Sequence, residues 1–394
     1  MLYLLFEAIR TWLLDTGLYG VLGVLDQVQF RAMLAAGLSF AIVIALGRRT
    51  IAFLVGLKIG DGGETDAEML RAHAKSKANV PTMGGLLICG AIFASTFLLA
   101  DLKVPQVLLG LFVLVWLAAV GGADDWLKLT AARRGTGRQG LHAWEKLVFQ
   151  LGIGAIAGYF AYRYSMAEGG GSLGHVLNLP FQRTFLPGSQ GVNPGVVFLA
   201  LPVFALIATL MIAGVSNAVN ITDGMDGLAG GISAVVAFAL LVLTLIAGSE
   251  EWAQYLLVPH VPRSDELAVL AGAMAGGCLG FLWWNAAPAK VFMGDTGSLA
   301  LGGLIGYIAV VIRQEAVVLM MCGVFILEIM SVVMQVGWFK YTRIKTGTGR
   351  RIFRVAPYHH HLHMGGWAEN QVVVRLWILA ILLCVIALTT LKLR

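Results

Sequence analysis

The stretch VLLGLFVLVWLAAVGGADDWLKL (Val107–Leu129) runs from apolar residues straight into two adjacent aspartates and a lysine. A membrane span needs about 20 predominantly apolar residues, and residues 104–123 supply such a run directly before Asp124. Asp124 and Asp125 therefore stand where the chain is expected to leave the bilayer. Because ionisable groups in or near a bilayer are costly and usually functional, this stretch indicates a membrane protein with chemistry at its surface.

The composition supports a membrane protein. Of the 394 residues, 58% are hydrophobic and 13% are charged, whereas a soluble globular protein carries about 25% charged residues. The net charge of +6 lies in short connections between apolar runs, which indicates membrane orientation rather than nucleic-acid binding. The four cysteines all fall inside apolar runs without a CxxC pair, so we interpret them as small buried hydrophobic residues.

Ten apolar runs are candidates for membrane-spanning helices. They lie near residues 27–47, 83–100, 104–123, 147–166, 196–215, 228–247, 267–284, 299–312, 316–338 and 374–392. We expect an all-α integral membrane protein with one transmembrane catalytic domain over residues 1–394, in which residues 1–26 form an N-terminal periplasmic or interfacial segment. Glycines four residues apart, as in Gly272, Gly276 and Gly280, predict close helix packing in lipid.

Lys and Arg are distributed unevenly between the two sets of connections. Those after the odd-numbered runs hold 18 Lys and Arg, whereas the opposite side holds 7. Because cytoplasmic loops carry the positive excess, we expect the odd-numbered connections to be cytoplasmic and both termini to be periplasmic. No connection is long enough for a soluble catalytic domain, so any chemistry is expected at or within the membrane surface.

Polar residues gather in the same, cytoplasmic set of connections. Asp124 and Asp125 follow the third run, and the other groups follow the fifth, seventh and ninth: Asn220, Asp223 and Asp226; Asn285 and Asp295; and APYHHHLHMGGW (Ala356–Trp367). Carboxylates, amides and cations that face one another suit a hard divalent cation with a phosphate substrate. The nearby lysines Lys77 and Lys128 would neutralise phosphate charge.

Each of these groups also has a simpler interpretation. The aspartate pair is typical of a solvated helix terminus, and Asp223 and Asp226 are typical of helix caps. FMGDTGS (Phe292–Ser298) is typical of a turn with an N-cap. The histidine run is compatible with a polar surface, a transition-metal tract or donors to phosphate. Four such groups on one predicted face favour a shared site.

Five motifs together carry a family resemblance. They are PTMGG (Pro81–Gly85), ADDWLK (Ala123–Lys128), NAVNITDGMDGLAGG (Asn217–Gly231), NAAPAKVFMGDTGSLALGG (Asn285–Gly303) and APYHHH (Ala356–His361). The chain resembles the polyprenyl-phosphate N-acetylhexosamine-1-phosphate transferase superfamily, from about residue 30 to the C-terminus. The histidine run followed by GGW, and the ending TTLKLR, favour its phospho-N-acetylmuramoyl-pentapeptide transferase branch.

The resemblance implies ten membrane helices, a Mg²⁺-dependent site facing the cytoplasm and a homodimer in the bacterial cytoplasmic (inner) membrane. It also implies the reaction: phospho-N-acetylmuramoyl-pentapeptide passes from its UDP-activated form to undecaprenyl phosphate, which gives lipid I and UMP for peptidoglycan synthesis. Asp295 matches the family's magnesium ligand, and the implied catalytic residues are Asp124, Asp125, Asp295 and His359. The implied substrate-binding residues are Lys77, Thr82, Lys128, Asn220, Asp223, Asp226, Asn285, Phe292, Gln335, His360 and His361.

This chain departs from the family pattern in a few places. The usual KxGTPTMGG reads KANVPTMGG, and a family lysine four residues after Lys128 is Ala132. His363 stands near the place of a glutamate that often follows the histidines, and loop 339–372 has about five extra residues. These changes leave the predicted metal site intact but put in doubt the contacts expected near Lys77 and Ala132.

For the mechanism, we predict in-line attack by the lipid phosphate on the sugar-bearing phosphorus. Asp124 or Asp125 orients the lipid phosphate, accepts its remaining proton or adds a contact to the metal. The alternative is a two-step reaction in which an aspartate is a covalent nucleophile. Two other functions stay open: a related transferase that uses UDP-N-acetylglucosamine, and an ion-coupled transporter. Transporters place acidic groups near the bilayer midplane, whereas the acids here lie at the ends of the runs.

Overall fold

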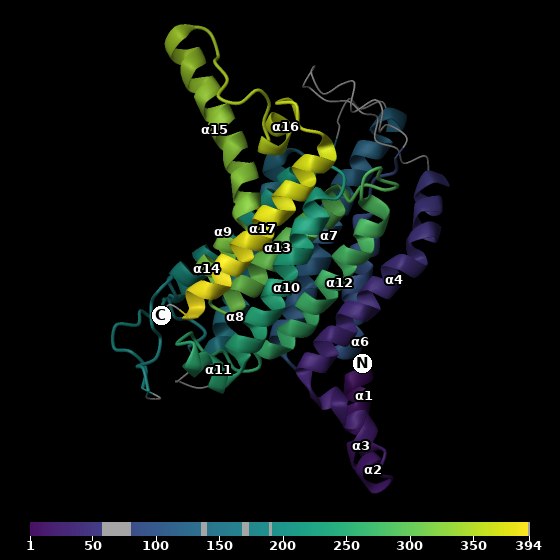
Figure 1. Cartoon of the computed structure of the whole chain (residues 1–394), viewed down its shortest axis with the longest axis vertical. Coiled ribbons are helices and arrows are strands. Elements are labelled where there is room, and N and C mark those ends of the chain that lie inside the picture. The colour runs from purple at the N-terminus through teal and green to yellow at the C-terminus, as the bar shows by residue number, and fades with distance from the viewer. Residues whose placement is uncertain (57–79, 135–139, 168–172, 189–190, 393–394) are drawn as a thin grey trace.

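The computed structural model describes residues 1–56, 80–134, 140–167, 173–188 and 191–392, and its regular elements there are helices, with two isolated β-bridges (Figure 1). Each of the ten predicted runs overlaps one of ten main helices in the described part of the chain. These helices are α4 (Val28–Gly56), α6 (Gly85–Leu99), α7 (Pro105–Arg134), α8 (Ala143–Ala167), α9 (Leu201–Thr222), α10 (Leu228–Gly248), α12 (Leu267–Asn285), α13 (Gly294–Val311), α15 (Gly323–Thr346) and α17 (Glu369–Lys392). The predicted fold class, an all-α integral membrane protein, is confirmed.

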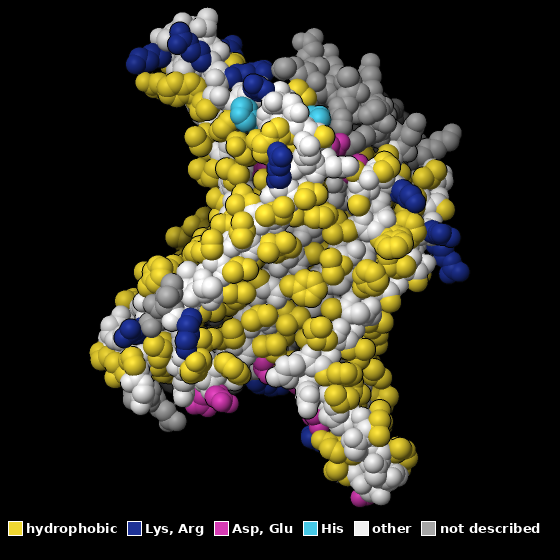
Figure 2. All heavy atoms as spheres, in the orientation of Figure 1, with side chains coloured by type: hydrophobic (Ala, Val, Ile, Leu, Met, Phe, Trp, Pro, Cys, Tyr) yellow, Lys and Arg dark blue, Asp and Glu magenta, His cyan; other side chains and the backbone are white. Residues whose placement is uncertain are grey.

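Most of these helices have the length and composition of membrane spans. Among the described residues, eight helices are long and apolar enough to cross a bilayer, and α6 is a shorter apolar helix of 15 residues. Figure 2 shows a broad band of hydrophobic side chains across the middle of the molecule, with Lys and Arg gathered near the free end of α15. This band is the surface expected to face lipid acyl chains.

Two helices form the centre of the bundle. Within the apolar, membrane-spanning segments of α12 and α13, 83% and 89% of the residues are buried inside the bundle. α12 packs along α4, while α13 packs between α7 and α9. A Cβ atom added at Gly272 or Gly276 would overlap the backbone of Ala32 or Ala36 on α4. The prediction that spaced glycines serve close helix packing is therefore confirmed for α12.

Two predicted helix boundaries are wrong, and both matter for the site. α7 continues to Arg134, so Asp124 and Asp125 lie within a helix rather than after one. α13 begins at Gly294 rather than near 299, which places Asp295 in its first turn. Both boundaries were predicted from side-chain polarity, but a helix continues wherever its backbone hydrogen bonds can form, including in water beyond the bilayer edge.

The ninth predicted run, 316–338, is broken in the structure. The short helix α14 (Glu315–Met321) ends at Cys322, and α15 begins at Gly323. α15 then leans away from the bundle, and its free end stands clear of the other helices in Figure 1.

The connections sort to two ends of the bundle. α16 (Tyr358–His363) and the free end of α15 lie at one end, and both chain termini lie toward the other, beside α1 (Leu2–Ala8) and α11 (Glu250–Tyr255) (Figure 1). The bundle thus has the relative arrangement expected from the charge distribution, with the histidines and the termini at opposite ends.

Candidate active site

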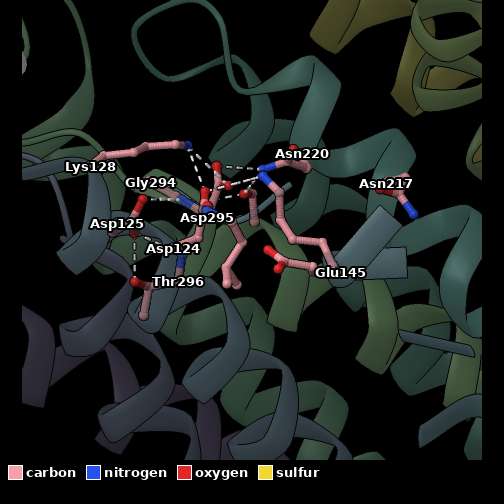
Figure 3. A network of polar contacts seen from close by, with 12 residues as sticks. Asp124, Asp125, Lys128, Glu145, Asn217, Asn220, Gly294, Asp295 and Thr296 are labelled. Atoms are coloured by element: carbon pink, nitrogen blue, oxygen red, sulfur yellow. Dashed lines mark hydrogen bonds and ion pairs between the residues drawn. The ribbon is translucent and has the colours of Figure 1, made fainter. Parts of the chain in front are cut away.

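Three carboxylates meet at the end of the bundle that carries α16. Asp124 and Asp125 come from α7, and Asp295 comes from the first turn of α13 (Figure 3). One oxygen from each carboxylate lies within 4.8 Å of the others. Asp124 and Asp125 are buried, with exposed fractions of 0% and 3%. The packing of α7 against α13 therefore brings together acids that are 170 residues apart in the chain.

Two lysines bridge this acid cluster. Lys128, one helical turn after Asp124, places Nζ 2.7 Å from Asp124 Oδ2 and 3.2 Å from Asp295 Oδ2. Lys146 on α8 places Nζ 3.1 Å and 2.8 Å from the same two oxygens. Burying a carboxylate without a partner is strongly destabilising, so the two ammonium groups make this cluster of acids tolerable. Lys128 was predicted as a site residue, whereas Lys146 was not.

Asn220 fixes the other oxygen of Asp295. Its Nδ2 donates to Asp295 Oδ1 at 2.9 Å and contacts Ser298 Oγ at 2.9 Å. Asp295 is therefore held by α7, α8 and α9 at once, through Lys128, Lys146 and Asn220. Asn220 therefore lies in direct contact with Asp295, as the predicted shared site requires.

Asp125 has a different set of partners from Asp124. Its Oδ1 accepts from Asp295 N at 3.1 Å, and its Oδ2 accepts from Thr296 N at 3.0 Å and Thr296 Oγ1 at 2.6 Å. Asp125 thus caps the N-terminus of α13 from a neighbouring helix, satisfying backbone N–H groups that lack partners within the helix.

Gly294 makes room for this contact. Its φ of +74° is rare for residues with a side chain, and an added Cβ would lie 2.6 Å from Asp125 Oδ2 and 2.8 Å from Thr82 Oγ1. The predicted site residue Thr82 therefore lies beside the start of α13.

The turn between α9 and α10 is tied to the segment that precedes α13. Asp226 Oδ2 accepts from Ala289 N at 3.0 Å. Asn285 Oδ1 accepts from Gly227 N at 2.9 Å, while its Nδ2 donates to Val291 O at 2.8 Å. The predicted residues Asp226 and Asn285 thus join these two segments through hydrogen bonds to backbone groups. Phe292, the next residue in that segment, is half-buried.

Asp223 lies directly after α9, between these two groups. Its partly buried position and the negative charges of Asp295 and Asp125 raise the pKa of the Asp223 carboxyl to about 7. Burial is the larger cause, because it disfavours the charged form. Asp223 is therefore poised to change its charge when a cation or an anion enters the site.

α16 brings two of the predicted histidines to the same turn. His359 is buried, and its backbone N and ring Nδ1 lie 3.2 Å and 3.1 Å from Glu328 Oε2 on α15. The His360 ring lies 4.2 Å from the His359 ring, measured between centroids. The ring of His359 also packs against Gly224, where an added Cβ would overlap Nε2. Glu328, which sequence reasoning missed, thus connects α15 to the histidines.

Gln335 on α15 and His361 on α16 support the loop that connects these two helices. His361 Nδ1 accepts from Arg354 N at 3.1 Å. Gln335 Oε1 accepts from Ile352 N and Phe353 N, both at 3.0 Å, and Nε2 donates to Phe353 O at 3.1 Å. These contacts hold the loop, and within the described residues none of them reaches the three carboxylates. Lys77, also predicted, lies outside the described residues.

Comparisons with known proteins agree with this architecture. A model of glycosyl transferase family 4 matches residues 107–313, which include α7, α9 and α13. The chain is 38% identical to the phospho-N-acetylmuramoyl-pentapeptide-transferase of Chloroherpeton thalassium, over 396 aligned residues and the whole of both chains. The transferases of the same name from Chlorobium chlorochromatii and Chlorobaculum tepidum are 40% and 39% identical, over 95% of this chain and 96% and 95% of theirs. The chain therefore belongs to the phospho-N-acetylmuramoyl-pentapeptide-transferase family of membrane phosphoglycosyl transferases.

Proposed function

We propose that this enzyme transfers phospho-N-acetylmuramoyl-pentapeptide from its UDP-activated form to undecaprenyl phosphate in peptidoglycan synthesis. The observation that carries the proposal is the meeting of Asp124, Asp295, Lys128 and Lys146 at one end of a membrane-spanning bundle. Two anionic substrates, one soluble and one in the membrane, need such a mixed-charge site at the bilayer surface.

The reaction exchanges one P–O bond for another. An oxygen of the lipid phosphate attacks the sugar-bearing phosphorus of the UDP-sugar, the bond from that phosphorus to the bridging oxygen breaks, and UMP leaves with that oxygen. The attacking oxygen is already anionic, so the enzyme's contribution is mainly positioning and neutralisation of charge. We assign the neutralisation to Lys128 and Lys146, and donation to the diphosphate to His359 and His360.

The contacts of the two adjacent aspartates favour direct attack over a covalent intermediate. Both oxygens of Asp125 accept hydrogen bonds from the start of α13. Asp124 Oδ1 accepts from Leu141 N at 2.6 Å, and its Oδ2 contacts both lysines. A carboxylate whose oxygens are engaged in this way is a weak nucleophile. We therefore assign to Asp124 the orientation of the lipid phosphate, and to Asp125 the anchoring of α13.

The carboxylate cluster fits a magnesium ion. Mg²⁺ takes oxygen ligands and is usually held by one or two carboxylates together with water and substrate phosphates. The three acids offer oxygens of that type within 4.8 Å of one another. We propose that Asp295 holds the ion, with Asp124 beside it. When bound, Mg²⁺ would polarise the diphosphate and make UMP a better leaving group.

The setting of the enzyme is also part of the proposal. We place residues 1–394 in one transmembrane catalytic domain of the bacterial cytoplasmic membrane, with the site facing the cytoplasm and both termini in the periplasm. The excess of Lys and Arg in the odd-numbered connections supports this orientation. A homodimer follows from the family resemblance.

A purified-enzyme assay of UMP release tests the function. We expect UMP only when UDP-N-acetylmuramoyl-pentapeptide, undecaprenyl phosphate and Mg²⁺ are all present. UDP-N-acetylglucosamine serves as the comparison substrate, and faster turnover with it would refute the assigned donor. Labelling of single cysteines from each side of inverted vesicles tests the orientation, since a cysteine near α16 should react from the cytoplasmic side.

A further inference from the structure

Glu328 is a buried acid that the reaction described above does not use. It is the sole charged residue in the apolar run 316–338, and its exposed fraction is 0%. Its Oε2 contacts the backbone N and the ring Nδ1 of His359, while its Oε1 has no hydrogen-bond partner among the described residues. A buried carboxylate is costly unless it is paired, so the histidine is the group that stabilises this acid here.

The contact fixes both the direction and the proton position of the His359 ring. A carboxylate oxygen accepts hydrogen bonds, so the network assigns a proton to His359 Nδ1. The second bond, from His359 N to the same oxygen, pins the residue at the start of α16. Nε2 then faces the opposite way, against Gly224, and has no hydrogen-bond partner within the described part of the chain.

The contact with Gly224 brings Nε2 of His359 to the turn between α9 and α10. Gly224 stands between Asp223, which is influenced by the charge of Asp295, and the buried Asp226. A side chain at Gly224 would collide with the ring, so the turn and His359 are built to lie in contact. His361, by comparison, uses its Nδ1 to accept from Arg354 N and is held by the loop.

We propose that Glu328 is a positioning residue for the transfer reaction: it accepts the Nδ1–H of His359 and directs Nε2 at the turn Asp223–Asp226, so that the ring, when both nitrogens carry a proton, donates Nε2–H to the substrate diphosphate. This inference rests on the proposed function and adds to it a residue that never touches substrate. An acid that orients an imidazole in this way fixes the ring and its Nδ1 proton, and loss of the corresponding partner of a metal-bound histidine costs on the order of 10- to 100-fold in function.

A double-mutant cycle on the full-length enzyme tests the proposal. The variants are Glu328→Ala, Glu328→Gln, His359→Ala and Glu328→Ala combined with His359→Ala, with kcat and the KM for the UDP-sugar measured separately. We expect Glu328→Ala to lower kcat by about 10- to 100-fold with a smaller change in KM. Glu328→Gln should retain more activity, since its amide oxygen can accept the same two bonds. In the His359→Ala background the Glu328 substitution should have no further effect on kcat.

Two results would overturn the proposal. The first is that Glu328→Ala lowers kcat by the same factor in the His359→Ala background as in the wild type. That result would mean that Glu328 acts independently of the histidine. The matched control is Glu315→Ala, which removes a buried acid at the start of α14 that pairs with Arg313 and is expected to lower stability without lowering kcat of the folded enzyme.

The second is a histidine-selective ¹⁵N spectrum of the wild type that shows His359 Nδ1 without a proton. That spectrum needs no turnover, so it decides the positioning claim even if the wild type proves inactive with the proposed substrates. Inactivity with those substrates would refute the function alone.

Discussion

Thr296 donates its hydroxyl to Asp125 at 2.6 Å, and this bond joins the first turn of α13 to α7. Asp295, the central acid of the site, is the residue next to Thr296. The position of Asp295 therefore depends on a contact that neither substrate makes. We expect Thr296→Val to destabilise the enzyme by about 1.5–3 kcal/mol, the usual worth of a hydrogen bond to a charged group, and to lower kcat as Asp295 shifts. Thermal unfolding and UMP release measure the two effects.

Thr296→Ser is the control for this prediction, because it keeps the hydroxyl. It should stay near wild type in both assays. A Thr296→Val enzyme with unchanged stability and turnover would show that Asp125 does not hold α13 in place.

Asp295 is predicted to be indispensable. Asp295→Asn removes one negative charge from the place where Lys128, Lys146 and Asn220 converge. We expect turnover to be abolished and the dependence on Mg²⁺ to weaken, because a neutral amide is a poor ligand for a hard cation. The exposed Asp15 at the other end of the molecule offers the control Asp15→Asn. Near-normal activity of Asp295→Asn would mean that the metal is held elsewhere.

Lys146 competes with a cation for the acid oxygens. Its Nζ lies 2.8 Å from Asp295 Oδ2 and 3.1 Å from Asp124 Oδ2. Lys146→Met is therefore expected to tighten the apparent affinity for Mg²⁺ while lowering kcat by about tenfold or more, since a hydrogen bond to a charged group is worth about 1.5–3 kcal/mol. Titration of turnover with Mg²⁺ gives both values. If the affinity for Mg²⁺ and kcat both fall, the lysine and the ion do not share these oxygens.

Asp223 links cation binding to pH. Its pKa is raised to about 7 by burial and by the charges of Asp295 and Asp125, so at pH 7 about half of the molecules carry a proton there. A bound cation favours the ionised carboxylate and lowers this pKa. Binding should therefore release about half a proton at pH 7 and much less at pH 8.5, where the carboxyl is already ionised before the cation binds.

Calorimetry in buffers of different ionisation enthalpy measures this release. Asp223→Asn should abolish it near pH 7. Proton release that persists unchanged in that variant would assign the titration to another group.

The helices and the approximate site were predictable because both leave local signals in the sequence. Apolar runs of membrane length give the ten helices, and the uneven distribution of Lys and Arg places the motifs at one end. Asp124, Asn220 and Asp295 follow from this placement alone. The ends of α7 and α13 were not predictable, because polarity marks where the bilayer ends and not where the helix ends.

The partners that complete the site could not be predicted from spacing. Lys146 meets Asp295 from 149 residues away, and Asp125 caps a helix whose start was predicted at the wrong residue. Glu328 did carry a signal, since a lone acid in an apolar run usually has a function. Its partner His359 became evident only from the packing of α15 against α16.

The most direct test of the account is a rapid-quench experiment with enzyme in excess over UDP-N-acetylmuramoyl-pentapeptide, run with Mg²⁺ and with or without undecaprenyl phosphate. Direct attack at the cluster of Asp124, Asp295 and the two lysines predicts one UMP for each lipid product when the lipid is present, and no UMP when it is absent. A burst of UMP without the lipid, equal to the amount of enzyme and accompanied by a phospho-sugar adduct on Asp124 or Asp125, would contradict it.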